Sequence, residues 1–160
     1  MSEKALDPNK MDDPEKIRAL MINADRKGRS DISWACKVRL AELAGRSYDD
    51  NLEREFWIAV HVAEEIKTQE NGKTTRLSRT RQKYQRDGAL KCIADLATKP
   101  GTTEGFHILA DNGRVDLTFE AVLLRHHGRF QAESMEIARN KLLDHGVDEA
   151  KVLGWINGET

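Results

Sequence analysis

The sequence predicts an all-α fold, a single-domain orthogonal helical array of about seven or eight short to medium helices. Apolar residues recur at the three- and four-residue spacing of amphipathic helices along most of the chain. Many of these segments begin beside a residue that can cap a helix and stop at a glycine. Because the segments are short and the turns frequent, a crossed array is favoured over a regular bundle.

The length of the chain bounds its domain organisation. Its 160 residues are enough for one domain with a core of its own. Residues 1–12 are polar and are expected to form a disordered tail, and residues 13–157 are expected to form one helical domain. Residues 98–103 include Pro100-Gly101 and predict a loop between two subregions, although it is too short to link separate domains.

The first two predicted helices form a hairpin. Asp13 and Pro14 begin the first helix, because an aspartate can cap exposed backbone N–H groups and proline needs no donor at the first helical position. Gly28 ends it. A second apolar pattern runs from Ser30 to Gly45, so a short turn joins two helices.

The longest predicted helix covers about residues 50–67. Its apolar face is the widest in the chain, and the turn Asn71-Gly72 follows it. We therefore expect it to be the central helix. The face consists of Leu52, Phe56, Ala59, Val60, Ala63 and Ile66.

The basic segment, residues 73–86, is the most informative part of the sequence. It holds six basic residues and no acidic one, in a chain whose formal net charge is -1. Like charges this close repel, so the segment is solvated, pairs with acidic groups of its own fold, or faces an anionic partner. Its helical periodicity predicts an amphipathic helix that breaks near Asp87-Gly88. The six residues are Lys73, Arg76, Arg79, Arg81, Lys83 and Arg86.

Residues 105–119 allow two interpretations. Apolar residues on both sides of Asn112-Gly113 are compatible with a β-hairpin, which would make the fold α+β. Helices are favoured, because Thr103 can cap one helix and because Phe119, Val122 and Leu123 share a face that a strand could not organise.

The last third of the chain predicts a helix that stops at Gly146 and a short closing helix. The closing helix should dock Trp155 into the core.

The basic segment suggests a function. Arginine and lysine neutralise phosphates and release condensed counterions, a contribution that depends on backbone charge and not on base sequence. The sequence therefore predicts a noncatalytic nucleic-acid-binding or nucleoprotein accessory protein, with DNA favoured over RNA. One alternative is a helical interaction module for an acidic protein; another is an enzyme whose site is dispersed along the sequence.

A second basic patch lies where the helix preceding residue 127 should end. The helix dipole favours cations at such an end, which is a structural reason for the patch. It could also extend a phosphate-binding surface if the fold brings it near Arg79 and Lys83. His126, inside the patch, is expected to be a satisfied core histidine. The patch consists of Arg125, His127 and Arg129.

The sequence contains no recognisable motif for catalysis, a metal or a cofactor. Cys36 and Cys92 are far apart and without metal-ligand spacing, and with the absence of a secretory signal they favour a cytoplasmic location. No stretch approaches the roughly 18 apolar residues of a membrane span, so no membrane partner is expected. The sequence does not indicate an oligomeric state.

Overall fold

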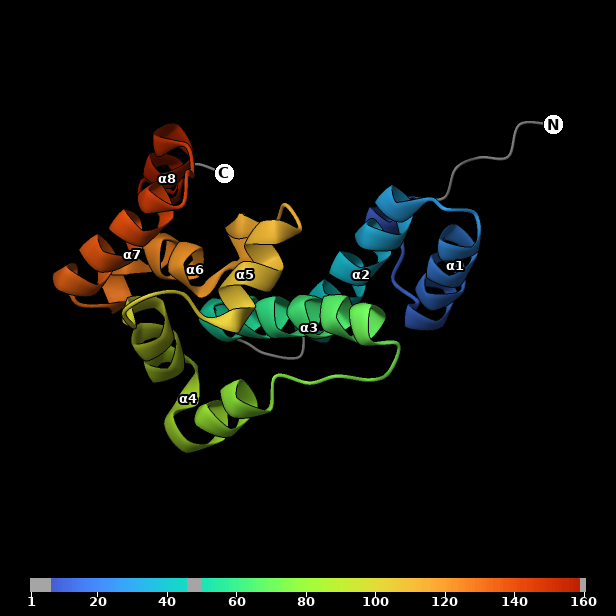
Figure 1. Ribbon diagram of the computed structural model, residues 1–160, viewed down its shortest axis with the longest axis horizontal. Coiled ribbons are helices and arrows are strands. Elements are labelled where there is room, and N and C mark those ends of the chain that lie inside the picture. The colour runs from blue at the N-terminus through green and yellow to red at the C-terminus, as the bar shows by residue number, and fades with distance from the viewer. Residues whose placement is uncertain (1–6, 46–49, 159–160) are drawn as a thin grey trace.

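Eight α-helices and three 3-10 helices form the described part of the chain, residues 7–45 and 50–158 of a computed structural model (Figure 1). No strand occurs in these residues, so the all-α prediction is confirmed and the β-hairpin alternative near residues 105–119 is wrong. The α-helices are α1 (Pro14–Arg26), α2 (Ser30–Gly45), α3 (Asn51–Asn71), α4 (Ser78–Thr98), α5 (Glu104–Asp111), α6 (Phe119–Arg125), α7 (Ala132–Asp144) and α8 (Glu149–Ile156); the 3-10 helices are η1 (Pro8–Lys10), η2 (Val115–Leu117) and η3 (His127–Arg129).

Capping side chains set several helix starts. Asp13 accepts a hydrogen bond from the backbone N–H of Glu15 at 3.0 Å, as its position before Pro14 predicts. The hydroxyl of Thr103 accepts one from the backbone N–H of Phe106 at 3.2 Å and begins α5 in the stretch where a hairpin was the alternative. These contacts satisfy N–H groups that have no partner within their own helix.

Helix α4 is bent in its middle. Gly88 has φ 84° and ψ 171°, which divides α4 into a first arm, residues 78–87, and a second arm, residues 89–98. Figure 1 shows the two arms at a marked angle to each other. The predicted break near Asp87-Gly88 is therefore confirmed. The second arm buries Ala89, Ile93 and Ala97 in the core.

The start of α4 corrects one sequence prediction. The basic segment was expected to be helical from about residue 73, yet residues 73–77 form a connection outside any helix. Side chains of α3 hold this connection: the Thr68 hydroxyl accepts from the Thr75 N–H at 2.9 Å, and Glu64 accepts from the Leu77 N–H at 2.9 Å. These hydrogen bonds tie the connection to α3, and the helix begins at Ser78.

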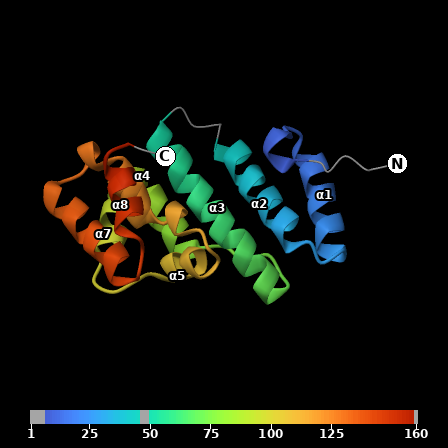
Figure 2. The ribbon, with the colours of Figure 1, turned by 90° about the horizontal axis from the view of Figure 1, so that it is seen from above.

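Helix α3 lies in the middle of the molecule, as its wide apolar face predicts. The α1–α2 hairpin packs against it through α2 on one side, and α4 to α8 gather on the other side (Figure 2). One core cluster joins α3 to the second arm of α4, α6, α7 and α8, and includes Trp155 as expected. This cluster has members on both sides of the 98–103 loop, so the loop does not divide two cores. A second cluster joins α2, α3 and α5.

Residues 7–12, within the segment expected to be a disordered tail, contact the domain. They include η1, and the guanidinium of the buried Arg39 donates to the Met11 carbonyl and to Asp12, each at 2.8 Å. Residues 1–6 lie outside the described residues. None of the described helices has both the length and the apolar composition that crossing a membrane requires.

Candidate anion-binding site

Arg81 is bound within the fold. Its Nε lies 2.6 Å from Oε2 of Glu64 and its Nη2 lies 2.6 Å from Oε1 of the same carboxylate, a bidentate pair. The guanidinium also lies over the Trp57 ring, 5.2 Å from the centroid. Arg81 therefore fastens the first arm of α4 to α3.

Glu64 is the acceptor at the centre of this contact, and its side chain is nearly inaccessible to solvent. Burial alone would raise its pKa, but hydrogen bonds from Arg81 and from the Leu77 N–H more than offset burial, so the pKa lies below its ordinary value. The carboxylate stays ionised because its neighbours compensate its charge. Glu64 thus neutralises the charge of Arg81, one of the residues predicted to contact phosphates.

Lys83 spans the bend of α4. Its Nζ lies 2.9 Å from Asp87 in the first arm and 2.8 Å from Asp95 in the second arm. Hydrogen bonds to Asp95 and Asp87 raise the pKa of Lys83. Arg86 differs: its guanidinium is 3.5 Å from Asp87 and its side chain is 69% exposed. Lys83 is internally paired, whereas Arg86 remains largely in solvent.

Three members of the basic segment are exposed and form no ion pair within the described part of the chain. Two of them lie in the connection before α4 and one at its first turn. We call these residues the cation row: Lys73, Arg76 and Arg79.

The second predicted patch is engaged in contacts inside the protein. Arg125 donates to Glu55 at 2.8 Å, and Arg129 donates to Asp50 at 2.7 Å. The His127 ring lies 2.9 Å from the carbonyl of Ile156. His126 is half-buried and also contacts Glu55, in agreement with a satisfied histidine. These contacts tie the end of α6 and η3 to α3 and to α8.

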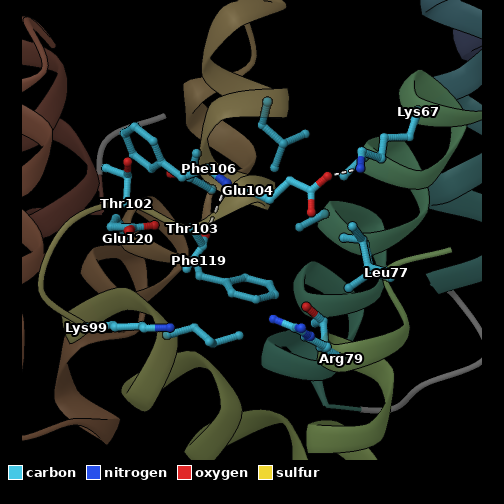
Figure 3. A pocket seen from close by; sticks show the side chains of 18 of the residues that line it. Lys67, Leu77, Arg79, Lys99, Thr102, Thr103, Glu104, Phe106, Phe119 and Glu120 are labelled. Atoms are coloured by element: carbon cyan, nitrogen blue, oxygen red, sulfur yellow. Dashed lines mark hydrogen bonds and ion pairs between the residues drawn. The ribbon is translucent and has the colours of Figure 1, made fainter. Parts of the chain in front are cut away.

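A cavity of about 600 Å³ lies between α3, the two arms of α4, α5 and α6, beside the cation row. Arg76, Arg79 and Lys99 line it. Lys99 directly follows α4, and Figure 3 shows it together with Arg79. Apolar side chains supply much of the remaining wall. They include Leu77, Leu96, Phe106, Leu109 and Phe119.

Two carboxylates also line the cavity, and both have cationic partners. Glu104 forms an ion pair with Lys67 at the rim. Glu120 is 2% exposed, and its Oε2 lies 3.0 Å from Nζ of Lys141. Burial raises the pKa of Glu120, and the attraction of Lys141 only partly offsets that effect. The cavity therefore has an excess of positive charge.

Sequence reasoning missed Lys99, Glu120 and the cavity itself. Lys99 stands alone between a helix and the Pro100-Gly101 turn, and Glu120 is a single acid in an apolar helix, so neither belongs to a pattern. The bend at Gly88 lets Lys99 and Arg79, at opposite ends of α4, line the same cavity, and α6 adds Glu120 to its wall. Within residues 7–45 and 50–158, no group of three or more His, Cys, Asp or Glu residues could hold a metal ion.

Compared with known protein families, with curated proteins and with solved structures, the chain shows no match. Its fold and site define its class: an all-α protein with a cationic cavity beside a row of exposed basic residues.

Proposed function

We propose that this chain is a noncatalytic nucleic-acid-binding or nucleoprotein accessory protein, with DNA favoured, that contacts phosphates through the cation row, Lys73, Arg76 and Arg79. Arg86 extends the row along the first arm of α4. This surface contains fewer residues than the nine that the sequence predicts to contact nucleic acid. A cytoplasmic location is part of the proposal and is supported by two buried free thiols, Cys36 and Cys92.

One observation carries the proposal: within a single short segment, the cations divide into paired and unpaired groups. Arg81 and Lys83 have carboxylate partners within 3 Å. The residues of the cation row have no carboxylate partner in the described residues. Because no carboxylate neutralises these exposed cations, they can attract the phosphate groups of a nucleic acid.

The number of free cations sets the expected strength of binding. Three or four phosphate contacts predict a log-log salt slope of about -3 for duplex DNA. Between about 50 mM and 200 mM salt, the affinity should then fall roughly 40- to 150-fold. Such a surface contacts phosphates and not base edges, so the affinity for DNA should depend little on base sequence.

The test is a fluorescence-anisotropy titration with duplex and single-stranded oligonucleotides at those two salt concentrations. The triple variant Lys73→Glu, Arg76→Glu, Arg79→Glu should lose most of the affinity and most of the salt dependence. A matched control changes the charge equally on exposed residues elsewhere: Lys16→Glu, Lys27→Glu, Lys151→Glu. The proposal is wrong if the natural protein does not bind, or if the two triple variants bind equally well.

A further inference from the structure

Two cations from opposite ends of α4 reach the same cavity. Arg79 lies in the first turn of α4, and Lys99 lies immediately after its last residue. A straight helix of this length would hold them roughly 30 Å apart. Because Gly88 bends the helix, both side chains reach one cavity, and Figure 3 shows them pointing toward each other from opposite sides.

The wall beside these cations is apolar and partly aromatic. The Phe119 ring stacks on Phe56 within the core, with ring centroids 5.2 Å apart and an angle of 10° between the planes, and it also lines the cavity. Leu96 and Phe106 add further apolar surface. The volume of about 600 Å³ falls in the range of roughly 300 to 1,000 Å³ that is typical of sites for small organic ligands.

The charges around the cavity do not cancel. Lys67 offsets Glu104, and Lys141 offsets Glu120. Arg76, Arg79 and Lys99 remain, and none of the three has a carboxylate partner in the described part of the chain. Cations that converge on an apolar cavity favour a ligand that carries a negative charge at one end.

We propose that this cavity binds a small amphipathic organic anion, with its carboxylate or phosphate head between Arg79 and Lys99 and its apolar body against Phe119, Leu96 and Phe106. This site overlaps the proposed nucleic-acid surface but is not identical to it, because Lys99 is not part of the cation row and Lys73 does not line the cavity. Arg76 and Arg79 are common to both sites.

Isothermal titration calorimetry with four probes tests the site. Octanoate and octyl phosphate carry the two candidate head groups, octanol has the apolar body without charge, and inorganic phosphate has the charge without an apolar body. Either or both anions should bind with one-to-one stoichiometry. Octanol and inorganic phosphate should bind at least about tenfold more weakly, because each loses one of the two contributions.

Variants locate the binding. Lys99→Gln, at an exposed position, should weaken the binding of the anionic probes about tenfold and leave the weak binding of octanol unchanged. Thr80→Trp, which fills the cavity from α4, should abolish binding of all probes that bind the natural protein. Lys73→Gln is the matched control and should change the affinity less than twofold. Circular dichroism establishes that each variant is folded.

The site assignment is overturned if neither anion binds, if octanol binds as tightly as the anions, or if Lys99→Gln and Lys73→Gln behave alike. A folded Thr80→Trp variant that retains full affinity overturns it as well. The two proposals can fail separately. Weaker DNA binding by Lys73→Gln with no effect on octanoate supports both, and a protein that binds octanoate but no DNA supports only the cavity.

Discussion

At the scale of single residues, the location of carboxylates decides what each cation does. Arg79 and Arg81 are two positions apart, so their side chains leave the first arm of α4 in very different directions. Arg81 faces α3 and meets Glu64, whereas Arg79 faces the cavity. The same residue type thus anchors a helix at one position and is free to bind an anion at the other.

The Glu64 contact makes stability depend on pH. Because the pKa of Glu64 is lowered in the folded state, its stabilisation is fully present above the unfolded-state pKa, about 4.3, and is lost as the pH falls through the folded-state value. Glu64→Gln, which cannot ionise, should lower the free energy of unfolding by about 1–3 kcal/mol at pH 7. The difference from the natural protein should shrink as the pH falls toward 3.5.

Urea unfolding at a series of pH values measures this difference. A matched control is Glu136→Gln, an exposed glutamate whose contact with Arg139 is long, 3.8 Å. It should change the free energy of unfolding by less than about 0.5 kcal/mol. A Glu64→Gln penalty that stays constant from pH 7 to pH 3.5 would show that ionisation of this carboxylate is not involved.

At the scale of elements, the bend of α4 positions both proposed binding surfaces. Gly88 adopts a positive φ with an extended ψ, a conformation that is essentially restricted to glycine. Lys83 adds a second constraint, because its ammonium bridges Asp87 and Asp95 across the bend. Without the bend, the second arm could not bury Ile93 while the first arm lies against α3.

Gly88→Ala should lower the free energy of unfolding by about 1–3 kcal/mol, since an added Cβ would have open space around it but the backbone would be strained. Gly128→Ala is the control: a Cβ there also has open space, and its φ is ordinary. It should change stability by less than about 0.5 kcal/mol. Chemical denaturation measures both, and equal effects would refute the role assigned to backbone strain.

At the scale of the whole molecule, the helices on the two sides of α3 differ in how much of their surface is buried. On one side, α1 buries only Ile17 and Ala24 and packs mainly on α2. On the other side, α6 is buried along most of its length and contacts α3, α4, α7 and α8. Apolar burial supplies most of the stability of a helix in a protein, so the molecule should not open uniformly.

Amide hydrogen exchange should reveal this difference. We expect the amides of α1 to exchange at least about tenfold faster than those of α6, because a helix with few buried contacts can open locally while the core stays closed. Hydrogen–deuterium exchange followed by mass spectrometry measures both helices in one experiment. Equal protection of α1 and α6 would mean that the molecule opens as a single unit.

The structural roles of residues that act on their immediate neighbours could be predicted from the sequence. Asp13 before Pro14, Thr103 before α5 and Gly88 inside α4 each fix a helix start or a break through contacts or backbone preferences within a few residues. The apolar spacing of α3 likewise predicted the central helix, because helical periodicity alone defines its buried face. The helical class therefore followed from local physics.

Contacts between residues far apart in the sequence could not be predicted from local patterns. Glu64 accepts hydrogen bonds from the Leu77 N–H and from Arg81, which are 13 and 17 positions away; these contacts tie the start of α4 to α3 and neutralise one cation. Glu55 binds Arg125 across 70 positions. Which cations remain exposed, and the meeting of Arg79 with Lys99 at one cavity, depend on how the helices pack, because a side chain's charge is compensated by its neighbours in space and not by its neighbours in sequence.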